Sequence, residues 1–104
     1  MLPKKRVTTH PGEVLQVEFL EPLGISQSEL ARHIGVMPYV VCELVRGKRG
    51  VSPRMAFMLS RALGTSPEFW IGLQTDHDLS KLMQTRAGKR VRDISPMVQP
   101  RNVL

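Results

Sequence analysis

The stretch between residues 26 and 48 constrains the fold of this chain more than any other part of the sequence. Ser26 and Glu29 have the spacing of a capping box, in which each side chain accepts a hydrogen bond from the backbone N–H of the other residue. Gly35 supplies the left-handed backbone that ends a helix, and a second apolar stretch then runs to Gly47. This spacing predicts two short helices joined by a tight turn.

Apolar residues recur at helical spacing in both of these helices. Those expected to face inward are Leu30, Ala31, Ile34, Val36, Val41 and Leu44. Ala31 is small where the helices must approach closely, and Gly35 permits the sharp turn. The pattern is that of a helix-turn-helix, in which one helix braces against the DNA backbone and the next lies in the major groove. An ordinary α-hairpin shares the hydrophobic spacing but does not require all of these residue types together.

Three further helices are predicted around this pair, so we expect a compact all-α domain of five helices. The first begins at Pro11, a proline in the first helical turn, and ends at Pro22 and Gly24. Two later helices begin at the cap-and-proline pairs Ser52-Pro53 and Ser66-Pro67. Their candidate buried residues are Met55, Ala56, Leu59, Ala62 and Leu63, then Phe69, Trp70, Leu73, Leu79 and Leu82.

The length of 104 residues allows one domain with a modest core. We divide the chain into a flexible basic segment (1–9), the helix-turn-helix domain (10–84) and a basic, largely irregular C-terminal tail (85–104). The net charge of +6 predicts attraction to polyanions. The basic residues gather in three clusters: Lys4, Lys5 and Arg6; Arg46, Lys48, Arg49 and Arg54; and Arg86, Lys89, Arg90 and Arg92.

The single cysteine, Cys42, excludes an intramolecular disulfide and fits a reducing compartment. No apolar run is long enough for a membrane span, and no signal-peptide segment follows the basic start. We therefore expect a cytoplasmic protein, associated with the nucleoid when it is bound to DNA, and no membrane contact.

The helix pair resembles the DNA-binding domain of the Cro/C1 (XRE) repressor family. The residues that carry this resemblance are Ser26-Gln27-x-Glu29-Leu30-Ala31, Gly35-Val36, Val41, Leu44 and Gly47-Lys48. A narrower set is similar to HigA-type antitoxins: His10-Pro11-Gly12-Glu13, Phe19 to Gly24, Gly47 to Gly50, Leu63 to Trp70 and Leu73-Gln74. These pieces follow the family order from residue 10 to about residue 79. The resemblance implies a lambda-repressor-like fold.

The resemblance also implies a function. It implies a repressor that binds the operator of its own type II toxin–antitoxin operon and neutralises a HigB toxin, a RelE-like ribonuclease that cuts mRNA on the ribosome. The antitoxin itself would not be an enzyme. A stand-alone XRE-family transcriptional regulator without a toxin partner is the alternative. The tail beyond residue 84 carries no family signature, and toxin contact, a DNA arm or neither role stays open for it.

Five residues match the DNA-facing positions of the two helices. Gln27 lies at the start of the bracing helix, where the family contacts phosphate or an adjacent base; a solvent-exposed helix start is the alternative. Pro38, Tyr39, Val40 and Glu43 match outward positions of the recognition helix. Related proteins usually carry Gln, Ser, Thr, Asn or Arg there, so this helix departs from the family pattern.

The departure limits direct base reading. Glu43 is an acid where phosphate charge is dense; it can accept from cytosine N4, or pair with Arg46 or a neighbouring base-reading side chain. Tyr39 can stack or contact a phosphate, Val40 can touch a thymine methyl group, and Pro38 donates nothing. Shape-dependent contacts would then carry more of the specificity.

Arg46, Lys48 and Arg49 follow the recognition helix and match the basic loop that lies along phosphates; a solvated basic loop is the alternative. Trp70 is expected in the core, with a dimer contact near Phe69 as the alternative. Because operator-reading proteins of this kind work as two-fold dimers, we expect a homodimer built by the fifth helix and the tail.

Metal and cofactor sites are not expected. His10, His33, His77 and Cys42 have spacings that match no ligand pattern. His10 is expected on a loop and His33 on an outward helix face. His77, with Asp76 and Asp78 beside it, is expected to be solvated on a polar helix face.

Overall fold

The structure, a computed structural model, describes residues 8–98. Within this range the chain is helical and has no strand. The elements are α1 (Pro11–Val14), η1 (Leu15–Leu20), α2 (Glu21–Leu23), α3 (Gln27–Ile34), α4 (Pro38–Val45), α5 (Pro53–Leu63), α6 (Pro67–Met83) and α7 (Arg86–Arg92). The first three run on without a break and form the predicted first helix, whose middle section η1 has wider π-type turns. The all-α class and the five predicted helices are confirmed.

Local capping explains where most of these helices begin and end. The Ser26 hydroxyl accepts from the Glu29 N–H at 3.0 Å, and the Glu29 carboxylate accepts from the Ser26 N–H at 2.8 Å. Ser52 and Ser66 cap α5 and α6 with the hydroxyl alone, which accepts from the N–H of Met55 and of Phe69, each at 3.1 Å. α4 differs because it begins at Pro38 without any side-chain cap. Its position therefore depends on packing more than on local signals.

The core lies where α3, α4 and α5 meet the first helix and the first half of α6. Its buried apolar residues are Leu15, Leu20, Leu30, Ala31, Val41, Leu44, Val51, Met55, Ala56, Leu59 and Trp70. Trp70 is fully buried, and its indole N–H donates to the Thr65 hydroxyl at 2.7 Å. Since its one polar atom is satisfied, Trp70 can fill the centre of the core, which confirms the core interpretation.

Gly12 sets how closely the first helix approaches the recognition helix. A Cβ atom on Gly12 would lie 1.8 Å from the Leu44 carbonyl oxygen. Only a residue without a side chain allows this approach, so α1 lies directly against the backbone of α4. This contact holds the recognition helix from behind.

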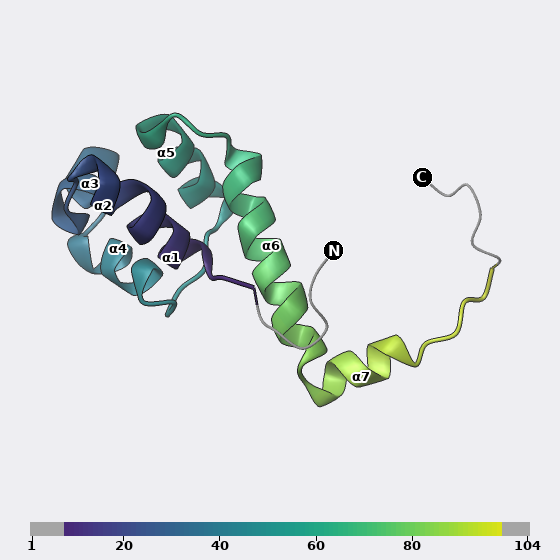
Figure 1. The fold of residues 1–104 in the computed structure, drawn as a ribbon. Coiled ribbons are helices and arrows are strands. Elements are labelled where there is room, and N and C mark those ends of the chain that lie inside the picture. The colour runs from purple at the N-terminus through teal and green to yellow at the C-terminus, as the bar shows by residue number, and fades with distance from the viewer. Residues whose placement is uncertain (1–7, 99–104) are drawn as a thin grey trace.

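The C-terminal part of the structure leaves the rest of the molecule. In Figure 1 α6 leads away from the other helices and α7 lies across its far end. We call residues 8–78 the body and residues 79–98 the arm. Leu79 and Leu82, which the sequence analysis placed in the core, are 47% and 37% exposed. That expectation is wrong because α6 is longer than the body it packs against.

α7 corrects a second expectation, that the tail is largely irregular. The Thr85 hydroxyl accepts from the Gly88 N–H at 3.1 Å and begins the helix. A Cβ on Gly88 would lie 2.1 Å from the Leu82 carbonyl oxygen, so this glycine permits close packing of α7 on the end of α6. The described end of the predicted flexible N-terminal segment also lies against α6, because the Thr8 N–H donates to the Ser80 hydroxyl at 2.9 Å. The expectations for Lys4, Lys5 and Arg6 and for residues 99–104 lie outside the described residues.

Candidate nucleic-acid interface

The turn between α3 and α4 has the geometry that the sequence predicts. Gly35 has a φ of 80°, and the N–H groups of Gly35 and Val36 both donate to the Ala31 carbonyl, at 2.9 and 3.0 Å. Val36 is half-buried against the core. The two helices therefore leave the turn at a fixed angle, with α4 held by the body on its inner side.

Three of the four residues expected on the outward face of α4 lie there, and the fourth lies partly against the core. Pro38 is exposed and Tyr39 is 57% exposed, while Glu43 is half-buried. Val40 is also half-buried and packs against the core. Val40 is therefore turned outward only in part, because it lies at the edge of the stripe that buries Val41 and Leu44.

Glu43 pairs with Arg49 and not with Arg46, the partner that the sequence analysis named. The Arg49 Nε and Nη2 atoms both donate to Glu43 Oε1, at 3.2 and 2.7 Å. The guanidinium carbon of Arg49 also lies 5.9 Å from the centre of the Tyr39 ring. Arg46, the partner suggested by the sequence spacing, is exposed on the loop. We call Tyr39, Glu43 and Arg49 the arginine clamp.

The loop after α4 folds back along the helix and is fixed at both ends. Gly47 has a φ of 76°, and the Lys48 N–H donates to the Glu43 carbonyl at 2.8 Å. On the far side of Arg49, the Val51 N–H donates to Gln74 Oε1 at 2.8 Å. Because backbone hydrogen bonds lie on both sides of Arg49, the clamp is positioned before any DNA is present.

Gln74 is a positioning residue to which the sequence analysis gave no role. Its amide nitrogen donates to Asp78 Oδ1 at 2.9 Å, which orients the amide so that its oxygen faces Val51. Gln74 lies one turn after the buried Trp70 on α6. A polar residue on an otherwise packed face was the signal that could have identified it.

His10 lies beside the same loop and His77 lies behind His10: a Cβ built on Gly47 would be 3.9 Å from the His10 ring. His10 Nδ1 accepts from the Gly12 N–H at 2.9 Å and so caps α1, while its ring lies edge-on to His77 with centroids 4.9 Å apart. Burial, with a smaller contribution from His77, holds the pKa of His10 below its usual value. The neutral ring can keep its acceptor nitrogen. His77 is half-buried and its Nδ1 lies 2.7 Å from the Thr8 carbonyl, so the expectation that His77 is solvated is wrong.

Gln27 is half-buried rather than freely exposed at the start of α3. Its amide nitrogen donates to Gln16 Oε1 at 3.2 Å, and the Gln16 amide donates to Glu21 at 3.1 Å. This chain of amides leaves the Gln27 carbonyl oxygen and its second N–H to a ligand. Lys48, like Arg46, is exposed on the loop beyond α4.

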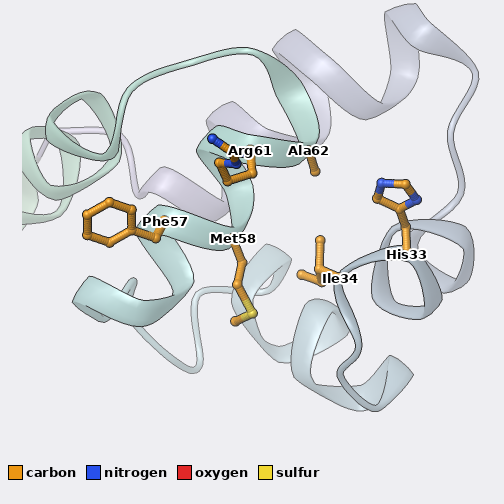
Figure 2. Close-up of a pocket in the computed structure, with 6 residues that line it drawn as sticks. All are labelled: His33, Ile34, Phe57, Met58, Arg61 and Ala62. Atoms are coloured by element: carbon orange, nitrogen blue, oxygen red, sulfur yellow. The ribbon is translucent and has the colours of Figure 1, made fainter.

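A shallow hollow of about 290 Å³ lies between α3 and α5. Figure 2 shows its lining: Ile34, Met58 and Ala62 are partly buried against the core, while His33, Phe57 and Arg61 are exposed around them. The residues that line it include no carboxylate and no nucleophile. Across residues 8–98, no three His, Cys, Asp or Glu side chains gather where a metal ion could be held. In the same range, no helix has the length and apolar character needed to cross a bilayer.

Two helices joined by a glycine turn, with a basic loop folded along the second, define a helix-turn-helix domain. A family model described as helix-turn-helix matches residues 18–70. Antitoxin HigA-1 of Vibrio cholerae is 44% identical over 72% of this chain and 70% of its own length. Virulence-associated protein A' of Dichelobacter nodosus is 41% identical over 77% of this chain and 70% of its own length.

Solved structures give the same result over more of the chain. The antitoxin HigA of Pseudomonas aeruginosa, solved with the higBA promoter, is 36% identical with a TM-score of 0.81, covering 89% of this chain and 100% of that one. The antitoxin GraA in complex with its operator is 37% identical with a TM-score of 0.82, covering 95% of this chain and 100% of that one. This chain belongs to the XRE-type helix-turn-helix family, in the group that includes the HigA antitoxins.

Proposed function

We propose that this chain is the antitoxin of a type II toxin–antitoxin pair and represses its own operon by binding the operator. The observation that carries this proposal is the match to GraA in complex with its operator, which extends over 95% of the chain and includes the arm. A generic helix-turn-helix match would end near Trp70, as the family model does. Agreement beyond that point shows that the chain shares the fold of these antitoxins as well as the helix-turn-helix motif.

The toxin partner is a HigB-like, mRNA-cleaving protein of the RelE type. Support comes from the relative named HigA-1 and from the HigA structure solved with a higBA promoter. The antitoxin blocks this enzyme and has no catalytic role of its own. It acts in the cytoplasm, on the nucleoid when it is bound to DNA.

A stand-alone regulator is the second candidate. A relative named as an uncharacterized HTH-type transcriptional regulator in Haemophilus influenzae is 40% identical over 71% of this chain. Such a protein would bind its operator through the same surface and would have no toxin to neutralise. The two candidates therefore differ in the partner and agree in the DNA interface.

The DNA interface consists of the start of α3, the outward face of α4 and the loop 46–51. Gln27 contacts phosphate or an adjacent base from the start of the bracing helix. Arg46 and Lys48 contact phosphates, which gives affinity without sequence preference. Tyr39 and Glu43 act through the arginine clamp. Pro38 and the half-buried Val40 contribute shape and apolar contact at the groove.

A homodimer places two such surfaces on one operator. The arm exposes six large apolar side chains: Leu79, Leu82, Val91, Ile94, Met97 and Val98. Exposed apolar residues gathered on one segment indicate an association surface. Because a two-fold dimer reads two half-sites about one helical turn apart, a second copy is the partner that fits.

The decisive experiment co-expresses this chain with the product of the adjacent gene. We expect a small basic protein to co-purify and its growth arrest to be relieved. Binding is then measured to the duplex upstream of the operon. Operator binding without co-purification or rescue would leave the stand-alone regulator. Absence of operator binding would overturn the repressor role in both candidates.

The dimer has its own test. Ending the chain at Gln84 removes α7, and analytical ultracentrifugation then measures the association constant. We expect weaker self-association and weaker operator binding. A dimer of unchanged affinity would assign the interface to another surface.

A further inference from the structure

We propose that Arg49 reads a guanine in the operator, with Glu43 and Tyr39 as the residues that position it. The proposal rests on the proposed operator binding and adds the base that is recognised and the atoms that recognise it. It also changes the role of Arg49, which the sequence analysis placed on phosphate.

The hydrogen bonds within the clamp leave one edge of the guanidinium free. Arginine has five N–H donors in one plane. Nε and Nη2 each donate one N–H to Glu43 Oε1, at 3.2 and 2.7 Å. These two bonds occupy the side edge of the guanidinium. The end edge, formed by Nη1 and the second N–H of Nη2, remains. That edge is the parallel fork that fits guanine O6 and N7 in the major groove.

The clamp lies on the face of α4 that meets the groove. Tyr39 and Glu43 are four residues apart, so both lie on the same side of the helix. The turn at Gly47 brings Arg49 back to them, with its guanidinium carbon 5.9 Å from the Tyr39 ring centre. The ring lies beside the guanidinium, and the two hydrogen bonds to the carboxylate restrict the rotation of the group. An arginine held in this way loses less freedom when it binds a base.

Charge favours a base over a phosphate as the ligand. Glu43 lies 2.7 Å from Arg49 in the ion pair, so the pair carries no net charge. An arginine meant for phosphate gains affinity from its charge, and a carboxylate in contact with it works against that gain. Guanine recognition depends on the direction of the N–H groups, which the carboxylate improves. The same pairing explains how an acid is tolerated on the DNA-facing side of α4.

The backbone around Arg49 supports the same conclusion. The Lys48 N–H is held by the Glu43 carbonyl and the Val51 N–H by Gln74. A Cβ on Gly50 would lie 2.9 Å from Gln74 Oε1, so the chain beside Arg49 also lies tightly against α6. A loop that only follows phosphates can adjust to them, whereas base reading needs a fixed position.

The test uses the full chain and separates two contributions of Arg49 to operator affinity: the contact with a base and the attraction of its charge to phosphate. Fluorescence anisotropy measures binding to the duplex upstream of the operon, and to duplexes in which single guanines are replaced by 7-deazaguanine, which lacks the N7 acceptor. We expect one guanine per half-site at which this replacement weakens the unmodified protein. The Arg49→Ala variant should bind the natural duplex roughly 5- to 150-fold more weakly, the range of one bidentate base contact, and should be indifferent to 7-deazaguanine at that position.

Two variants separate geometry from charge. Arg49→Lys keeps the charge and loses the fork, so it should behave like Arg49→Ala. Glu43→Gln should reduce discrimination at the same guanine, while the positive charge that it uncovers on Arg49 tightens binding to all duplexes alike. Lys48→Ala is the matched control: it should weaken all duplexes alike and lower the slope of log K against log[salt] by about 1. The Glu43→Gln/Arg49→Ala double variant removes both charges of the neutral pair and should leave that slope nearly unchanged, whereas Arg49→Ala alone also uncovers the Glu43 carboxylate. Thermal unfolding monitored by circular dichroism confirms that each variant is folded.

The proposal is overturned if Arg49→Lys restores binding, if the Glu43→Gln/Arg49→Ala double variant lowers the salt slope as Lys48→Ala does, or if Arg49→Ala still discriminates at every guanine. The positioning role of Glu43 is overturned if Glu43→Gln leaves discrimination at that guanine unchanged. These results leave the repressor role intact as long as the unmodified protein prefers its own promoter to random DNA. An unmodified protein without that preference overturns both the guanine contact and the repressor role.

Discussion

The body and the arm bury their apolar residues in different ways. In the body, Trp70 and Leu15 are fully buried among residues that lie far apart in the sequence. In the arm, Leu79 and Val91 occur at helical spacing as well, yet 47% and 50% of their surface is exposed. The body therefore completes its core within one chain, whereas the arm has an apolar face that a second chain can cover. Helical periodicity alone does not distinguish the two cases.

The largest expected difference in the free energy of unfolding comes from shortening a side chain at the centre of the body. Trp70→Ala should lower the free energy of unfolding by about 3–5 kcal/mol, because it leaves a cavity and an unpaired Thr65 hydroxyl. Leu82→Ala is the matched variant in the arm and should change the value by less than about 1 kcal/mol. Urea unfolding followed by circular dichroism, at concentrations where the chain is monomeric, measures both. Equal losses would mean that the arm belongs to the same cooperative core.

Two glycines give a closer comparison, since each permits contact between helix backbones. Gly12→Ala would place Cβ 1.8 Å from the Leu44 carbonyl oxygen, and Gly88→Ala would place it 2.1 Å from that of Leu82. We expect Gly12→Ala to cost about 1–3 kcal/mol in global stability. Gly88→Ala should instead detach α7 and leave the main transition in place. Amide hydrogen exchange distinguishes the two, with fast exchange confined to α7 in the second variant.

The His10 cap should make the stability of the body depend on pH. Because the folded state lowers the pKa of His10 below 6.5, the unfolded chain binds the proton more readily. The stabilisation is thus fully present above about pH 6.5 and is lost as the pH falls through the lower folded value. His10→Asn keeps a capping oxygen and does not titrate. The difference in the free energy of unfolding between the natural chain and His10→Asn should be constant above about pH 6.5 and decline below it.

The smallest effect is expected at the start of α3, on the surface of the body. The Ser26 N–H lowers the pKa of Glu29 below 4.5 by donating to the carboxylate. The stabilisation is present above that value and is lost as the pH falls through the folded pKa. Glu29→Gln should be slightly less stable than the natural chain at about pH 7, and the difference should shrink as the pH falls through the folded pKa of Glu29. A difference that persists in acid would assign the effect to something other than the carboxylate charge.

The helix-turn-helix could be predicted from the sequence because its signals are local. Ser26 and Glu29 form their hydrogen bonds within three residues, and Gly35 needs its left-handed φ for the turn alone. Such features do not depend on how the rest of the chain folds. The start of α7 escaped notice because Gly88 suggests a loop, although here it permits close packing on Leu82.

The candidate site was only partly predictable because its contacts cross a turn. The sequence places Arg46 three residues after Glu43, at helical spacing, whereas the reversal at Gly47 brings Arg49 to the carboxylate instead. The hydrogen bond from Val51 to Gln74 spans 23 residues and depends on where α6 crosses the loop. No local pattern specifies either contact. The roles of the predicted DNA-facing residues stay predictions until binding is measured.

α6 connects the two functions of the molecule through one continuous element. Near its middle, Gln74 holds the loop that carries Arg49, and at its end Leu82 lies on the arm. In the proposed dimer this helix fixes the distance between the DNA interface of one chain and the partner chain. Its length and rotation would set the number of base pairs between the two half-sites. One residue inserted between Gln74 and Leu82 would rotate the partner chain by about 100° and move it by about 1.5 Å. The second DNA interface would then no longer face its half-site in the operator.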